Sequence, residues 1–164
     1  MKYLIELLAF CALFTMMVKY AVRGGAIDGL YFYPKEVQDR AIAIGLTSRE
    51  MMNRKRKEFM PLFFIVMTGA LLFIIAYVNN VGDFRTAYLQ SLLFLEVMNW
   101  YDGIVIDKIW VGFSRFWLLP GTEDLPYVQT WKQVLKKRSI LSLIWIVGAA
   151  VTALLIVLMG YVLK

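Results

Sequence analysis

The sequence predicts an all-α integral membrane protein, a bundle of four membrane-spanning helices with short amphipathic helices on the cytoplasmic side. Hydrophobic residues make up 60% of the 164 residues and charged residues only 18%, whereas soluble domains are nearer half apolar and a quarter charged. The apolar residues also gather in four segments of about 20 residues, the length that an α-helix needs to cross a bilayer. A chain of this length has room for a single membrane domain, residues 1–164.

The predicted spans cover residues 3–20, 59–78, 86–106 and 139–163. The second and fourth contain no charged residue. The first carries Glu6 and Lys19 near its two ends, and no small-residue cleavage site follows it, so we expect a retained helix and not a cleaved signal. The third is unusual because Glu96 and Asp102 lie within it.

Basic residues gather in the two long loops, residues 21–58 and 107–138, which contain the runs RKRK and KKR. The short link between the second and third spans holds only Arg85. Lys and Arg stay on the cytoplasmic side of a membrane. We therefore expect both loops to be cytoplasmic and both termini extracytoplasmic, in a multi-pass protein of a bacterial plasma membrane. The net charge of +6 lies beside apolar segments, which indicates contact with lipid headgroups and no nucleic acid.

The loops contain signals for short helices at the membrane interface. Apolar residues over 37–44 follow the spacing of one helical face, and Gly45 is a plausible stop. Residues 47–50, TSRE, fit a capping box that opens a helix running into the second span. In the second loop, Asp124 is a candidate cap for a helix with Pro126 in its first turn.

Polar side chains form a stripe along the third span. At about 100° per residue, Glu96, Asn99, Gly103 and Asp107 share one face, and Asp102 flanks Asn99. Glu96 is the midpoint of the span, where a charge costs about 2.5–3.5 kcal/mol on the most lenient scale. We therefore expect Glu96 to be neutral, paired or facing a wet cavity, either as a functional group or as a hydrogen-bonded packing residue.

The stripe and its neighbours form the predicted ligand site. The predicted ligand-binding residues are Glu96, Asn99, Trp100, Asp102, Gly103, Asp107, Trp110 and Arg115. Carboxylates supply negative charge and aromatic faces attract ammonium groups. This combination favours binding or transport of a cationic or amphipathic small molecule or lipid. Lys19 and Arg115 are the candidate cationic partners of Asp102 and Asp107, because long basic side chains can snorkel along a span.

Two other functions fit the same residues. One is an enzyme acting on a lipid headgroup at the cytoplasmic interface through carboxylate general acid–base chemistry. Its residues would be Asp102, Asp107, Arg115, Glu123 and Asp124. The other is a structural or accessory subunit that grips a membrane partner protein or a second copy of the chain. No catalytic residue is assigned from the sequence.

Histidine is absent and Cys11 is the single cysteine, so the sequence predicts neither a transition-metal site nor a disulfide. No phosphate-binding loop, nucleophile elbow or dinucleotide fingerprint occurs, and we expect no cofactor. Residues 99–103, NWYDG, partly resemble the D-x-x-D-G opening of the CDP-alcohol phosphotransferase signature, but Asn99 replaces its first carboxylate. Four spans with one membrane glutamate are similar to the small multidrug transporters, whose glutamate lies in the first helix. Neither likeness identifies a family.

Overall fold

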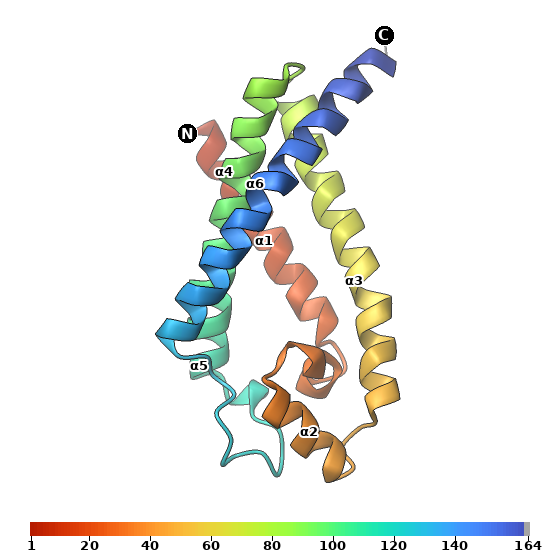
Figure 1. The fold of residues 1–164 in the computed structure, drawn as a ribbon, viewed down its shortest axis with the longest axis vertical. Coiled ribbons are helices and arrows are strands. Elements are labelled where there is room, and N and C mark those ends of the chain that lie inside the picture. The colour runs from red at the N-terminus through yellow and green to blue at the C-terminus, as the bar shows by residue number, and fades with distance from the viewer. Residues whose placement is uncertain (163–164) are drawn as a thin grey trace.

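The computed structural model describes residues 1–162 and contains helices and connecting turns, with no strand in that range (Figure 1). The all-α prediction is therefore confirmed. The long helices are α1 (Lys2–Ala21), α3 (Arg49–Leu72) with its continuation η2 (Phe73–Val78), α4 (Phe84–Tyr101) with its continuation η3 (Asp102–Trp110), and α6 (Trp131–Val162). The short ones are η1 (Ala26–Phe32), α2 (Lys35–Ala43), α5 (Val111–Phe113) and η4 (Arg115–Trp117).

Three helices are long and apolar enough to cross a membrane: Lys2–Ala21, Arg49–Val78 and Trp131–Tyr161. They contain the first and second predicted spans and residues 139–161 of the fourth, whose last residue, 163, lies outside the described residues. The third predicted span, residues 86–106, is helical but is not among the three, because its polar side chains offset its apolar ones. The structure thus supports a helical protein with three candidate spans. The fourth span stays a prediction.

The α4–η3 segment packs along α6 and also contacts α1, while α3 diverges from α6 towards the lower end of the view (Figure 1). Small residues allow the close approach of α6 to α4: Leu95 packs against Gly148, and Ala149 and Ala153 are completely buried. On the α1 side, the rings of Phe10 and Phe94 meet edge to face with centroids 5.6 Å apart. These contacts hold α4 between α6 and α1.

The helix changes its winding where α4 becomes η3. Residues 102–110 form a π-helix, in which the backbone N–H bonds the carbonyl five residues earlier instead of four. Residues five apart, such as Asp102 and Asp107, therefore lie one above the other. A regular α-helix would separate them by about 140° at 100° per residue. The sequence predicted that Asp102 would lie beside the stripe and not on it. That prediction is wrong, because the π-helical winding brings Asp102 to the same side as Asp107.

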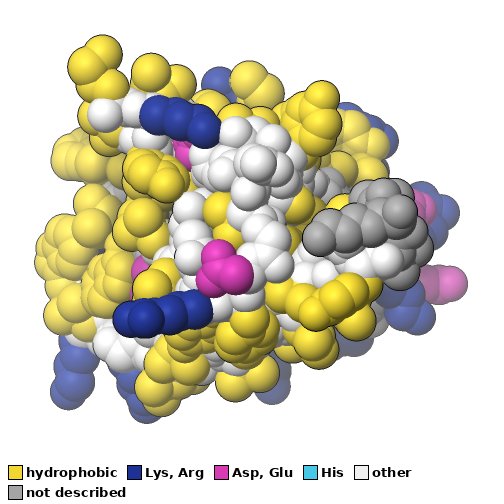
Figure 2. Space-filling model, turned by 90° about the horizontal axis from the view of Figure 1, so that it is seen from above, with side chains coloured by type: hydrophobic (Ala, Val, Ile, Leu, Met, Phe, Trp, Pro, Cys, Tyr) yellow, Lys and Arg dark blue, Asp and Glu magenta, His cyan; other side chains and the backbone are white. Residues whose placement is uncertain are grey.

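The N-terminus and the described end of α6 lie at one end of the molecule, and the long loops lie at the other (Figure 1). Figure 2 looks onto the end with the termini, where hydrophobic side chains are abundant and charged ones are scattered. At this end Glu6, 9% exposed, accepts a hydrogen bond from Asn79 Nδ2 at 3.0 Å and lies 3.8 Å from Lys2 Nζ. These contacts join α1 to the connection between η2 and α4.

The two long loops pack against each other at the opposite end. Val37 and Ala41 of α2 are completely buried, as their spacing predicted, and Tyr33 Oη donates a 2.7 Å hydrogen bond to the carbonyl of Trp117. Ile44, the last apolar residue of the predicted α2 face, is 47% exposed and follows the end of the helix. Gly45 follows α2 with φ of +78°, which confirms the predicted stop.

Two predicted caps are corrected. Helix α3 begins one residue later than expected, because Ser48 and not Thr47 accepts a hydrogen bond, from Met51 N. No helix follows Asp124. Instead α6 begins at Trp131, after Thr130, whose hydroxyl accepts from Gln133 N while Gln133 Oε1 accepts from Thr130 N. This reciprocal pair is a capping box, T-W-K-Q, that the sequence reading overlooked.

Candidate functional site

An arginine from α6 lies at the centre of the polar face of α4 and η3. Arg138 is only 2% exposed, and its guanidinium pairs with two carboxylates of η3. Nη1 lies 2.6 Å from Asp102 Oδ2, and Nη2 pairs with Asp107 Oδ2. Lys137 Nζ adds a second cation 3.3 Å from the same Asp107 oxygen. The π-helical winding allows one guanidinium to pair with both carboxylates, because it brings them to one side of the helix.

Gly103 leaves room for the arginine. A Cβ at this position would lie 2.8 Å from Arg138 Nε and 3.0 Å from Arg138 Cγ, so any side chain here would displace the guanidinium. Gly103 therefore belongs to the cluster as predicted, and its role in the structure is to accommodate Arg138. Arg138 Nε itself is buried without a hydrogen-bond partner among residues 1–162.

A chain of hydrogen bonds continues from Arg138 towards Glu96. Asn99 is 2% exposed, and its Nδ2 donates to the Arg138 carbonyl at 3.0 Å and to Ser142 Oγ at 3.1 Å. Ser142 Oγ in turn donates to Glu96 Oε2 at 2.6 Å. Arg138 and Ser142 lie one turn apart on α6, four residues being the spacing of one helical face. Arg138 and Ser142 together therefore contact Glu96, Asn99, Asp102 and Asp107 from α6.

The three carboxylates of the stripe differ in their charge partners. Asp102 and Asp107 share two cations, Arg138 and Lys137, so this part of the cluster is balanced. Within residues 1–162, no Lys or Arg forms an ion pair with Glu96, whose polar contact is the Ser142 hydroxyl. Glu96 is therefore the carboxylate of the stripe without a compensating charge in the described chain.

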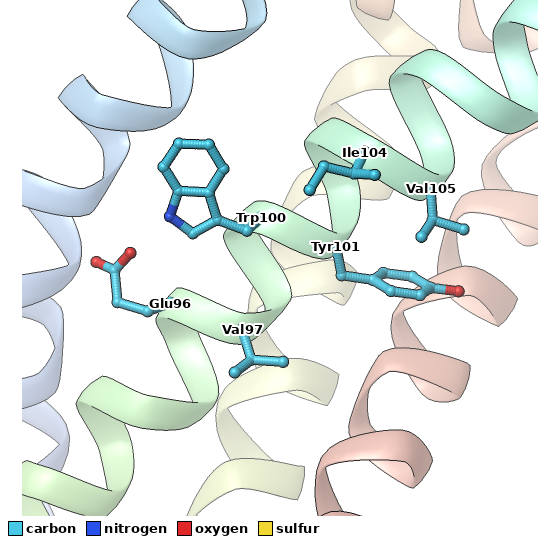
Figure 3. Close-up of a pocket in the computed structure, with 6 residues that line it drawn as sticks. All are labelled: Glu96, Val97, Trp100, Tyr101, Ile104 and Val105. Atoms are coloured by element: carbon cyan, nitrogen blue, oxygen red, sulfur yellow. The ribbon is translucent and has the colours of Figure 1, made fainter.

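Glu96 also borders an open hollow on the face of α4 and η3 between α6 and α1 (Figure 3). The hollow has a volume of about 390 Å³, within the ~300–1,000 Å³ typical of small-molecule sites. Its lining consists of Glu96, Val97, Trp100, Tyr101, Ile104 and Val105. Figure 3 shows Glu96 and Trp100 on the side of α6, whereas Tyr101 and Val105 point towards α1. Glu96 and two aromatic residues thus line an otherwise aliphatic hollow, with the Glu96 carboxylate directed towards Ser142 of α6.

Tyr101 is fixed in this position from the α1 side. Its hydroxyl lies 2.8 Å from Thr15 Oγ1, and its ring meets Phe14 edge to face with centroids 6.5 Å apart. Tyr101 was not among the predicted ligand-binding residues, although a tyrosine next to Trp100 in a polar span is a signal that could have identified it.

No protein-family model, curated protein or solved structure matches the chain. The residues and their geometry are therefore the basis for a functional assignment.

The structure separates the remaining predicted residues from the cluster. Trp110 packs edge to face on Trp117 with centroids 5.2 Å apart, and Lys19 lies 6.0 Å from the centre of the Trp110 ring. Arg115 is exposed in η4. The prediction that Lys19 or Arg115 pairs with Asp102 or Asp107 is wrong, because Arg138 and Lys137 of α6 occupy that position.

The loop acids of the predicted headgroup enzyme lie elsewhere as well. Glu123 Oε1 accepts a hydrogen bond from Gly121 N at 3.0 Å, and Asp124 pairs with Arg40 at 3.4 Å. Each is engaged within the loops, away from Asp102 and Asp107. Glu123 and Asp124 therefore do not join the cluster that Asp102 and Asp107 form with Arg138.

Sequence reasoning overlooked Arg138 and Ser142. Both stand at the start of the fourth apolar segment, where KKR looked like an ordinary cytoplasmic flank. Their spacing of four residues was the available signal, because it places both side chains on one face of α6.

Proposed function

We propose that this chain is a four-span membrane protein that binds a cationic, amphipathic small molecule at Glu96 and moves it between the bilayer and water. The uncompensated carboxylate of Glu96, bordering an open hollow with Trp100 and Tyr101, is the observation that carries the proposal. In this proposal α4 and η3 form the third span. The basic loops face the cytoplasm and the termini face outwards, in keeping with the distribution of Lys and Arg.

The hollow suits a lipophilic cation on three grounds. A carboxylate in an apolar setting attracts a positive charge more strongly than it would in water. Aromatic faces such as those of Trp100 and Tyr101 attract ammonium and related cations. The aliphatic part of the lining accommodates hydrocarbon, and the open side allows entry from the acyl-chain region. A small soluble ion would lack the third of these interactions.

The proposal assigns the cation to Glu96 and not to Asp102 or Asp107, because both of these already pair with Arg138. A ligand cation there would have to displace Arg138, which is buried and held by both carboxylates. Removing such a partner leaves a buried charge without compensation and costs several kcal/mol. Glu96 requires no such displacement.

Binding of tetraphenylphosphonium to the purified chain in nanodiscs tests the proposal. Glu96→Gln keeps the size of the side chain and removes its charge, and we expect affinity to fall at least about tenfold, as for loss of a charge-assisted contact. Glu123→Gln is the matched control, because Glu123 lies in a loop outside the hollow. Equal affinities of the wild-type and Glu96→Gln proteins would refute the proposal.

Uptake of the same cation into proteoliposomes distinguishes binding from transport. Accumulation driven by an imposed proton gradient, and lost in Glu96→Gln, is the expected result for transport. Binding without uptake would restrict the function to capture. A variant that neither binds less nor transports less, and that only unfolds more readily, would assign Glu96 to helix packing through Ser142.

A further inference from the structure

A second, smaller hollow lies at the loop end of the molecule, between the end of α1, η1 and the first turns of α3. Its volume is about 70 Å³, room for one polar group, since a water molecule in the liquid occupies ~30 Å³. Two cations, Arg23 and Lys55, and two anions, Asp28 and Glu58, line it. The charges of the lining therefore sum to zero, and both signs are available within one site.

One cation of this hollow is available for a ligand. The Arg23 guanidinium stacks on the Tyr20 ring, 4.2 Å from its centre, and within residues 1–162 it forms no ion pair. Lys55, by contrast, pairs with Asp28 at 3.3 Å. The N–H groups of a guanidinium form a planar fork, the geometry that binds phosphate oxygens.

Tyr31 supplies a hydrogen-bond donor without an acceptor. It lines the hollow, and its hydroxyl oxygen is buried with no hydrogen-bond partner among residues 1–162. Burial and the nearby Asp28 carboxylate raise the pKa of Tyr31 above its ordinary value, so the hydroxyl keeps its proton. A buried donor without an acceptor costs about 1–3 kcal/mol, and an oxygen of a bound group would remove that cost.

The second anion stands at the rim. The Glu58 side chain is 63% exposed and lies 3.7 Å from Arg54, an exposed contact of the kind that contributes little. Below it on α3, Phe59 and Leu62 form the apolar part of the lining. Helix α3 continues from here as a candidate membrane span. The hollow thus offers an anion at its rim, Glu58, and a cation and a hydroxyl inside, Arg23 and Tyr31. Apolar side chains of α3 continue from it.

We propose that this hollow binds a phospholipid with a phosphoethanolamine headgroup. The phosphate accepts hydrogen bonds from Arg23 and the Tyr31 hydroxyl, and the primary ammonium donates to Glu58. The acyl chains follow α3 into the membrane from the exposed Leu62 side chain. A glycerol headgroup carries no cation to offset the charge of Glu58. A choline headgroup has no N–H to donate. The assignment is independent of Glu96, which lines the other hollow and not this one.

Native mass spectrometry of the delipidated chain tests the assignment. The protein is offered equal amounts of phosphatidylethanolamine, phosphatidylglycerol and phosphatidylcholine with identical acyl chains. We expect phosphatidylethanolamine to be retained about tenfold over the other two, as expected for one charge-assisted hydrogen bond. We expect Tyr31→Phe and Arg23→Gln each to reduce its retention by a similar factor. Arg56→Gln removes an exposed charge of α3 outside the hollow and should change nothing.

Each alternative result overturns the assignment. Preference for phosphatidylglycerol would mean that the basic loops attract lipid by net charge alone. Equal retention of phosphatidylcholine would exclude a hydrogen bond from the ammonium to Glu58. Binding of soluble phosphoethanolamine at the same concentration would make the ligand a free headgroup and not a lipid. Tyr31→Phe keeps the ring and so preserves the packing of η1, which separates loss of the hydroxyl from loss of the fold.

Discussion

Replacement of the buried arginine is the sharpest test of the polar cluster. In Arg138→Met the side chain keeps most of its length and apolar stem but loses its charge, leaving Asp102 without a partner and Asp107 with Lys137 alone. Removing one partner from a buried ion pair typically costs 3–5 kcal/mol. Arg138 is 2% exposed and pairs with two carboxylates, so we expect about 4 kcal/mol less stability, within that range.

The chain provides its own reporter for this measurement. Cys11 is the single cysteine, it is free, and it is 5% exposed. A thiol-reactive fluorophore therefore labels the protein in detergent only when α1 separates from its neighbours. The denaturant dependence of labelling gives the free energy of unfolding. Lys136→Met is the matched control, because Lys136 is exposed on α6 and such surface changes stay within about 0.5 kcal/mol.

A second variant isolates the cause. Combining Arg138→Met with Asp102→Asn and Asp107→Asn removes the charges of the arginine and of both its carboxylate partners. Replacing a whole buried ion pair by neutral groups often changes the free energy of unfolding little. We expect the triple variant to recover most of the lost stability. Stability of Arg138→Met within about 0.5 kcal/mol of the wild type would refute the reasoning. A triple variant no more stable than the single one would show that packing of the arginine stem, and not its charge, matters.

Two further changes are predicted for the same unfolding assay. Gly103→Ala places a methyl group 2.8 Å from Arg138 Nε, so we expect a loss of about 1–3 kcal/mol; Gly69→Ala, where nothing lies within 4 Å, should not destabilise the protein. Equal stability of these two glycine variants would contradict the close fit. Tyr33→Phe removes the buried 2.7 Å hydrogen bond to the Trp117 carbonyl, which joins the two loops, and should cost about 1–3 kcal/mol. Unchanged stability would mean that water replaces the hydroxyl.

Some of the cluster followed from the sequence because it depends on local spacing. Glu96, Asn99, Gly103 and Asp107 were predicted to share a face, and all four do meet α6 through Arg138 or Ser142. That prediction needed only the helical repeat. It required no knowledge of which helix would lie opposite.

The partners could not be predicted in this way. Asn99 and Ser142 are 43 residues apart, and Asp107 and Arg138 are 31 apart, so their contact depends on how α4 and α6 cross. Proximity in the sequence favoured Arg115, and membrane depth favoured Lys19, and both choices were wrong. The π-helix could not be predicted either, because the sequence analysis assumed a constant rotation of about 100° per residue. It is nevertheless the reason that Asp102 faces Arg138.

The amino-acid sequence by itself determined the helical class, the apolar segments, the stop at Gly45 and the polar face of the third segment. These properties depend on residue type and on periods of three to four residues, which act within one helix. Only the tertiary structure decided that Asp102 and Asp107 pair with cations of α6, while no Lys or Arg among residues 1–162 pairs with Glu96. Charge compensation depends on distance in space, because Coulomb energy at a buried site is set by the nearest opposite charge, whichever helix carries it.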